Sequence, residues 1–133
     1  MRYIIDASVT ASWLLPDENV PAAQVILDKL AFADGLVPAL WLYEVTNICV
    51  MAFRRGRLSQ HQLTDALNRM DRLPIKVETD IPLLPIRYLA ERYALTIYDA
   101  AYLEPALRLD GQLATFDKAL AAAALANGVL ARA

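Results

Sequence analysis

The sequence has one cysteine and one histidine in 133 residues. A single cysteine excludes intramolecular disulfides and metal sites built from several thiolates. Cys49 stands inside an apolar segment, which predicts a buried, inert thiol in a reducing environment. His61 stands in the amphipathic stretch SQHQL, which predicts a solvent-facing helix position rather than a general base.

Long hydrophobic runs and an excess of positive charge are also missing. The longest apolar runs, residues 36–43 and 119–126, fall well short of the roughly 20 residues of a membrane span. Asp6 comes too early for a signal peptide, so we expect a cytoplasmic protein without a membrane segment. The net charge of −2 is unlike that of a protein that grips long nucleic acid, so any such contact should be local or carried by bound cations.

Apolar residues make up 57% of the chain, above the roughly 45 to 50% of ordinary domains. The excess predicts apolar surface that a partner or a second copy covers. The length suits one domain, residues 1–133, that folds without disulfide or metal staples.

Short apolar runs alternate with helical segments along the chain. Strands are expected at residues 3–5, 36–37, 75–78, 113–116 and 129–130, with helices at 8–15, 21–34, 39–55, 59–72, 80–93, from 96 onward and at 118–126. We expect Gly35 to end the second helix, Ser59 and Gln62 to form a capping box, and Asp80 to cap the helix that contains Pro82. This alternation predicts an α/β fold with a mostly parallel sheet.

Residues 39–53, ALWLYEVTNICVMAF, form the most apolar long helix, and Glu44 is its only charged side chain. Leu40, Glu44, Asn47 and Met51 fall on one stripe at helical spacing. A carboxylate carried into a core costs on the order of several kcal/mol unless it is protonated, paired or bound to a cation. Glu44 therefore needs a specific partner.

Three aspartates stand where helices are expected to begin. Asp6 and Asp117 each follow a predicted strand, and binding sites in open parallel sheets lie outside such strand ends. Asp99 follows Thr96 by three residues, as in a capping box. Helix capping explains these three as well as a binding site does, but it does not explain Glu44, which lies well inside its helix.

A divalent cation would account for all four carboxylates together. Mg²⁺ and Mn²⁺ are hard ions that prefer a few carboxylate oxygens plus water. Such an ion lowers the pKa of a bound water and offsets charge on a phosphate oxygen, which is the chemistry of metal-assisted phosphodiester hydrolysis. The predicted metal ligands and catalytic residues are Asp6, Glu44, Asp99 and Asp117.

Four stretches resemble, in order, the motifs of the PIN-domain nucleases, and among them the VapC-type toxins of prokaryotic toxin–antitoxin pairs. They are YIIDASV, LWLYEVTNI, LTIYDAAYLEPA and LATFDKAL, and they extend over nearly the whole chain. The resemblance implies a three-layer α/β fold with about five parallel strands and helices on both faces. It also implies a Mg²⁺- or Mn²⁺-dependent endoribonuclease that acts on RNA.

Two partners follow from the same resemblance. One is a second copy of the chain in a homodimer, for which the helices at residues 22–33 and 58–72 are candidate surfaces. The other is a small cognate antitoxin whose C-terminal segment wraps the toxin and enters the acidic pocket.

Three further positions match the resemblance beside the acids. Ser8 and Thr115 would orient a carboxylate or a metal-bound water; a helix cap and an ordinary strand threonine are the alternatives. Asn47, one turn from Glu44, would hydrogen-bond it, reach substrate or simply pack in the helix.

The basic group formed by Arg54, Arg55 and Arg57 is expected either to interact with the helix dipole or to contact an RNA phosphate. Pro105 departs from the resemblance, because an interior proline costs about 3 kcal/mol or bends a helix. Glu104 beside it is expected to be a surface or capping residue.

Three alternatives to a toxin nuclease remain compatible with an α/β fold. A non-catalytic PIN-like module that binds RNA or protein would usually have lost one of the four acids, and none is missing. A housekeeping PIN nuclease without an antitoxin is a second alternative. An Asp-based phosphotransferase or receiver domain needs a second aspartate near the first, and the chain has Ala7 and Ser8 after Asp6.

Overall fold

Strands and helices alternate through the chain, and the predicted α/β fold is confirmed. The computed structural model describes residues 1–132. The elements are β1 (Arg2–Ile5), α1 (Ala7–Leu14), α2 (Pro21–Lys29), β2 (Asp34–Pro38), α3 (Leu40–Arg54), α4 (Gln60–Asp71), β3 (Ile75–Glu78), α5 (Leu83–Tyr93), α6 (Ile97–Arg108), β4 (Gln112–Ala114) and α7 (Lys118–Ala126).

The sheet is parallel throughout, with strand order β3-β2-β1-β4. About five strands were expected, and the fifth is reduced to a single bridge between Leu113 and Leu130. The chain adds β2 and β3 on one side of β1 and then returns to place β4 on the other side. The strand order therefore reverses between β1 and β4, and the carboxyl ends of these two strands are where a parallel sheet is expected to bind ligands.

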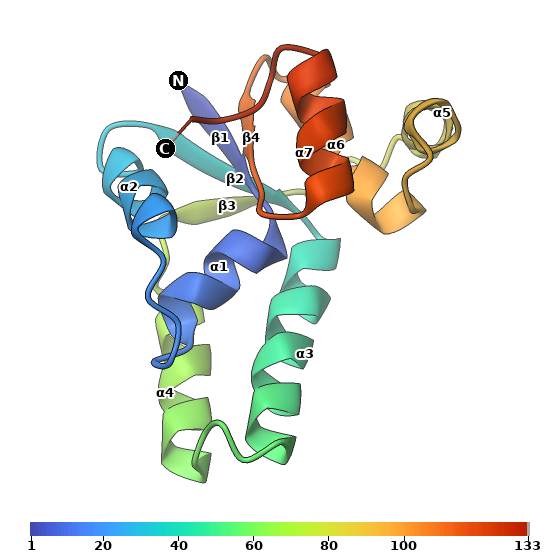
Figure 1. The fold of residues 1–133 in the computed structure, drawn as a ribbon. Coiled ribbons are helices and arrows are strands. Elements are labelled where there is room, and N and C mark those ends of the chain that lie inside the picture. Colours follow the sequence, from blue (N-terminus) through green and yellow to red (C-terminus); the bar gives the residue numbers. More distant parts are fainter. Residues whose placement is uncertain (133) are drawn as a thin grey trace.

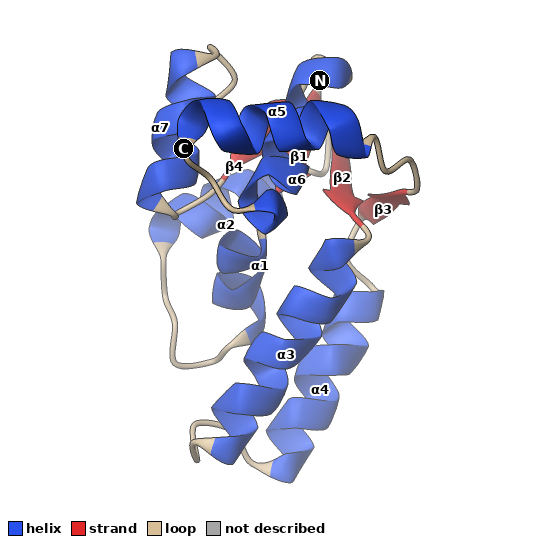
Figure 2. Ribbon diagram, turned by 90° about the vertical axis from the view of Figure 1, so that its right-hand side faces the viewer, coloured by secondary structure: helices blue, strands red, loops and turns tan. Residues whose placement is uncertain are grey.

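Helices cover both faces of the sheet. Ile4 and Ile5 of the central strand β1 are fully buried, as expected for a strand covered on both sides. Helix α6 packs on β1, β2 and β4, and Figure 2 shows it in front of the strands with α1 and α2 behind them. None of the helices in residues 1–132 is long and apolar enough to cross a membrane.

Helices α3 and α4 form an antiparallel pair that extends away from the sheet (Figure 1). The start of α3 is anchored from within, because the buried indole nitrogen of Trp41 donates to Thr10 Oγ1 of α1 at 2.8 Å. The predicted capping box at the start of α4 is confirmed, with Gln62 N donating to Ser59 Oγ and Ser59 N donating to Gln62 Oε1. These contacts fix the direction in which α3 leaves the sheet.

Two predicted helix boundaries are wrong. Helix α2 ends at Lys29, and Gly35 lies in β2, where a Cβ would come within 3.1 Å of the Pro74 carbonyl oxygen. This glycine serves close strand packing instead of ending a helix. Helix α5 begins after Pro82 and not at Asp80.

Other expectations near the end of the chain also need correction. Strand β4 ends at Ala114, two residues earlier than predicted. Helix α6 continues through the buried Pro105 to Arg108. Glu104 is not a surface residue: it is 4% exposed and accepts from Arg108 Nε at 2.8 and 2.9 Å.

Two predictions about the solvent exposure of single residues are confirmed. Cys49 is free and fully buried, so the thiol is held away from solvent. His61 is solvent-exposed beside Asp65 on α4, as expected for the outer face of an amphipathic helix.

Candidate active site

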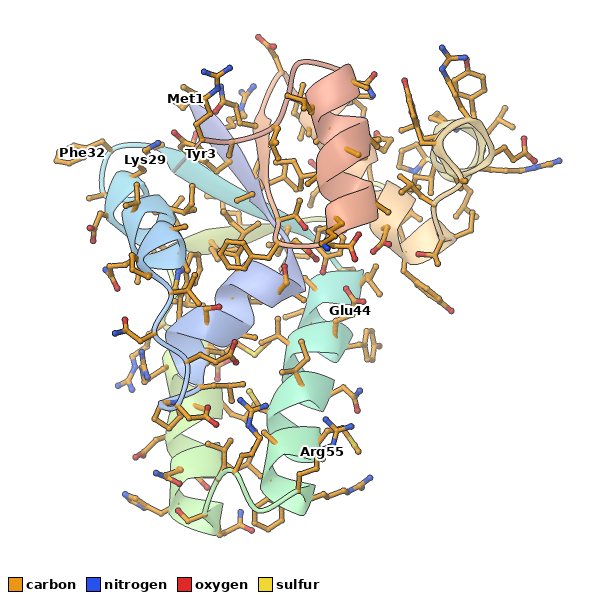
Figure 3. All side chains as sticks on the ribbon, viewed as in Figure 1. Met1, Tyr3, Lys29, Phe32, Glu44 and Arg55 are labelled. Atoms are coloured by element: carbon orange, nitrogen blue, oxygen red, sulfur yellow. The ribbon has the colours of Figure 1, made fainter. Side chains whose placement is uncertain are left out.

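The four predicted acids come from four different elements at one edge of the fold. Asp6 follows β1, Asp117 lies beyond β4 at the start of α7, Glu44 is in the first half of α3, and Asp99 is in the first turn of α6. Figure 3 shows Glu44 near the end of α3 that adjoins the sheet. Two strand-to-helix turns meet at the switch point: the β1–α1 turn carries Asp6, and the β4–α7 turn carries Asp117.

Asp6 is the most buried of the four, at 6% exposed. Its Oδ2 atom accepts hydrogen bonds from Ser8 Oγ at 2.8 Å and from Thr115 Oγ1 at 2.7 Å. Asp6 occupies the N-cap position of α1, but its side chain makes no capping hydrogen bond. The capping explanation of Asp6 is therefore wrong, and two hydroxyl groups orient its carboxylate.

The same hydroxyl groups hold the turn between β4 and α7. Thr115 Oγ1 accepts from Asp117 N at 3.0 Å, and Ser8 Oγ accepts from Phe116 N at 3.2 Å. Asp117 itself caps α7, because its Oδ2 accepts from Leu120 N at 2.9 Å. Capping engages that one oxygen and leaves Oδ1 outside the hydrogen bond.

Glu44 is held by a tyrosine. Tyr102 Oη, on α6, donates to Glu44 Oε1 at 2.7 Å. Burial raises the pKa of Glu44, and the negative charges of Asp6 and Asp99 raise it further. Within residues 1–132 no arginine or lysine forms an ion pair with Glu44.

Asp99 lies in the first turn of α6, where Thr96 supplies the helix cap. Thr96 Oγ1 accepts from the backbone nitrogen of Asp99 at 3.1 Å. Burial raises the pKa of Asp99, with smaller contributions from Asp117 and Asp6. Burial also raises the pKa of Asp6, and the charge of Asp117 adds to that effect. These carboxylates are therefore close enough to repel one another.

The oxygen atoms of the four acids are the kind of ligand that a hard divalent cation prefers. Their side chains, however, do not converge tightly enough to surround one. Among the residues described, no three His, Cys, Asp or Glu side chains lie close enough together to hold a metal ion. The acids nevertheless carry oxygen ligands, and neutral hydroxyl groups, not cations, hold Asp6 and Glu44. Their like charges are thus left uncompensated, which is the condition that binding of Mg²⁺ or Mn²⁺ would relieve. Glu44 and Asp99 are partly exposed and Asp117 is exposed, so a cation can reach them from solvent.

Asn47 lies one helical turn from Glu44 on α3. It is exposed on α3 and lines a shallow groove with Leu42, Tyr43 and Thr46. No hydrogen bond joins it to Glu44 in the described chain, and its exposure excludes packing in the core. The hydrogen bond to Glu44 is therefore not formed, and substrate contact by Asn47 stays a prediction.

The arginine group lies at the opposite end of α3 from Glu44 (Figure 3). At a rise of about 1.5 Å per residue, Arg54 is roughly 15 Å along the helix from Glu44. Arg57 Nε and Nη2 donate to both carboxylate oxygens of Asp17 at 2.9 Å, and these bonds lower the pKa of Asp17. Arg57 is thus engaged in a surface ion pair, whereas Arg54 lies in the last turn of α3, as the helix-dipole explanation requires.

Sequence reasoning did not identify Tyr102. It follows Asp99 by three residues, so the two side chains lie on neighbouring positions of one helix face. The signal available in the sequence was a tyrosine at this spacing inside the segment DAAYL.

Comparisons with known proteins agree with the fold. The family model described as PIN domain matches residues 3–125. Ribonuclease VapC3 from Pyrobaculum aerophilum is 30% identical over 124 residues, covering 91% of this chain and 93% of the relative.

Two solved structures have the same fold. The crystal structure of PAE2754 from Pyrobaculum aerophilum superimposes with a TM-score of 0.68 at 24% identity, covering 92% of this chain and 84% of the other. VapBC2 from Rickettsia felis, bound to a DNA fragment from its promoter, gives a TM-score of 0.64 at 12% identity over 88% of this chain and 89% of the other. At these identities the likeness concerns the fold alone.

Proposed function

Because the chain belongs to the PIN domain family, we propose that it is a divalent-cation-dependent endoribonuclease and the toxin of a toxin–antitoxin pair. One observation carries the proposal: Glu44 stands among like charges, without a basic partner in the described chain, and is held by a neutral hydroxyl group. A structural carboxylate would be expected to have a cationic partner, whereas a metal ligand needs its negative charge free.

In this proposal four acids provide the ligands of the cation, and two hydroxyl groups orient one of these acids. Asp6, Glu44, Asp99 and Asp117 would hold Mg²⁺ or Mn²⁺. Ser8 and Thr115 keep the Asp6 carboxylate in one orientation, which lowers the cost of ordering it on binding. The cation, when bound, would supply an activated water and offset the charge that develops on the phosphate.

Glu44 and Asp99 are both partly exposed, and burial raises the pKa of each. A raised pKa makes a carboxylate a stronger base, provided that it is still ionised at the working pH. Within the proposed mechanism, these two are the candidates to receive a proton from the attacking water.

RNA would reach the acids past the exposed face of α3. Asn47 is placed to contact the strand near the acids, and Arg54 and Arg55 are candidates for a phosphate contact farther along the same helix. Arg57 is less suited, because Asp17 and Glu18 already neutralise it. A net charge of −2 agrees with a local contact that involves few phosphates.

The proposed partners are an antitoxin, RNA and a second copy of the chain in a homodimer, all in the cytoplasm. The similarity to Ribonuclease VapC3 supports the ribonuclease assignment, and the shared fold with VapBC2 agrees with pairing to an antitoxin. Large exposed apolar side chains, such as Phe32 on the loop after α2 and Leu84 on α5, agree with burial against partners.

The test of catalysis is RNA cleavage by the purified chain in Mg²⁺ and in EDTA. We expect Asp6→Asn and Asp99→Asn to reduce the Mg²⁺-dependent rate by on the order of 100-fold or more, because each removes a ligand charge. Asp65→Asn, an exposed carboxylate on α4, is the matched control and should cleave as the wild type does. Full activity of both site variants, or equal cleavage in EDTA, would contradict the proposal and favour a non-catalytic binding module.

A separate experiment distinguishes a toxin from a housekeeping nuclease. The chain is expressed alone and together with the product of a small neighbouring open reading frame, and cellular RNA is mapped in both cases. A toxin should arrest growth alone and be neutralised by its neighbour. Unimpaired growth with active enzyme in the cell would instead support a housekeeping role.

A further inference from the structure

We propose that Tyr102 is a positioning residue that keeps the Glu44 carboxylate turned toward the other acids. Tyr102 belongs to α6 and Glu44 to α3, so one hydrogen bond of 2.7 Å connects the two helices at the site. The inference rests on the proposed function, because it assigns a role relative to the acids that would hold the cation.

The position of Tyr102 explains why this bond is specific. The residue is fully buried, and a buried phenol needs a hydrogen-bond partner for its hydroxyl group. That partner is a carboxylate at the edge of the acidic site and not a backbone carbonyl. At 2.7 Å the contact has the usual length of a hydrogen bond donated by a hydroxyl group.

Electrostatic repulsion would otherwise move Glu44 away. Asp6 and Asp99 raise the pKa of Glu44, so both lie close enough to repel its charge. Glu44 is only partly buried, and a carboxylate with a free path to solvent would rotate outward. The Tyr102 hydroxyl group opposes that rotation without neutralising the charge, as a lysine or arginine would.

Tyr102 also links Glu44 to the helix that carries Asp99. Asp99 and Tyr102 are three residues apart on α6, about one helical turn. The Tyr102 hydrogen bond therefore ties Glu44 of α3 to the first two turns of α6. Ser8 and Thr115 likewise hold Asp6, so hydroxyl groups would preorganise two of the four acids.

The test compares Tyr102→Phe with the wild type, and Tyr93→Phe is the matched control. Phenylalanine keeps the ring and removes only the hydroxyl group. Tyr93 bonds Asn127 at 3.3 Å, outside the acidic site. Three quantities are measured: the Mn²⁺ concentration at the midpoint of thermal stabilisation, and kcat and KM for RNA cleavage.

We expect Tyr102→Phe to raise the Mn²⁺ midpoint about 10-fold and to lower kcat by about 10- to 100-fold, the usual range for groups that orient metal ligands. KM for RNA should change little, because Tyr102 is buried and does not reach the substrate. Tyr93→Phe should match the wild type in all three quantities.

A double-mutant cycle separates positioning from a general effect on stability. If Tyr102 acts through Glu44, Tyr102→Phe should have no further effect on the Mn²⁺ midpoint in a Glu44→Gln background. An equal effect in both backgrounds would overturn the inference, as would wild-type values in Tyr102→Phe.

Should Tyr102→Phe fail to fold, Glu44→Asp takes its place. It keeps the charge but withdraws the carboxylate from Tyr102, so an unchanged midpoint would again overturn the inference. Absence of both Mn²⁺ binding and cleavage in the wild type would instead overturn the proposed function, and the inference with it.

Discussion

At the scale of single residues, neutral hydroxyl groups organise the acids. Asp6 is bound by Ser8 and Thr115, and Glu44 by Tyr102. A hydroxyl donor orients a carboxylate and leaves its charge intact, whereas a salt bridge would neutralise it. Because these donors are neutral, the negative charges of Asp6 and Glu44 are not compensated by a salt bridge, as the proposed binding of a cation requires.

Glu44 provides a prediction that does not depend on activity. Added Mg²⁺ or Mn²⁺ should raise the melting temperature of the wild type more than that of Glu44→Gln, because a ligand that binds only the folded state stabilises it. The control is Glu91→Gln, an exposed residue of α5 paired with Arg87, which should respond as the wild type does. Differential scanning fluorimetry measures all three. The same rise in Glu44→Gln and the wild type would contradict ligation through this residue.

At the scale of elements, local signals and tertiary packing each set part of the pattern. The capping box of Ser59 and Gln62 begins α4 where the sequence predicts, because cap and helix lie within a few residues of one another. Helix α2 stops at Lys29, well before Gly35, and Gly35 lies in β2, where a Cβ would come close to the Pro74 carbonyl oxygen. Boundaries decided by distant contacts are the ones that local signals misplace.

The capping box gives the element-scale prediction. Ser59→Ala should lower the free energy of unfolding by about 1 kcal/mol, because the backbone nitrogen of Gln62 loses its acceptor. Gln60→Ala, the next and equally exposed residue, should change it by less than about 0.5 kcal/mol. Urea denaturation measures both. RNA cleavage by Ser59→Ala should be unchanged at a temperature where it is folded, and a large loss of cleavage would show that α4 contributes to the site.

At the scale of the whole molecule, the fold brings carboxylates that repel one another to one edge of the sheet. Burial raises the pKa values of Asp6, Glu44 and Asp99, and their mutual charges and that of Asp117 add to this. A carboxyl group whose pKa is higher in the folded than in the unfolded state binds more protons when folded. Its contribution to stability is fully present below the unfolded pKa of about 4 and is lost as pH rises through the folded value.

This repulsion predicts how stability depends on pH and on cations. In a chelator, the free energy of unfolding of the wild type should decline from about pH 4 upward relative to that of Asp6→Asn, which lacks one of the repelling charges. Urea denaturation at pH 4 to 8 measures the difference between the two proteins, so that groups elsewhere cancel. Millimolar Mg²⁺ should reduce the difference. Parallel curves for the two proteins in the chelator would contradict the repulsion.

The sequence by itself determined the alternation of strands and helices, the choice of four acids as candidates and the solvent position of His61, because periodicity, turn residues and motif spacing are local properties. Whether each aspartate caps a helix or is free for another partner was decided only by the tertiary structure. The Asp6 carboxylate accepts hydrogen bonds from Ser8 and Thr115 and does not cap α1, whereas the Asp117 carboxylate caps α7.

Tertiary contacts also paired Arg57 with Asp17 across 40 residues. They placed Tyr102 against Glu44 across 58 residues. The physical reason is the same in each case. A side chain's hydrogen-bond partner depends on which elements the sheet order brings together, and no local pattern records that order.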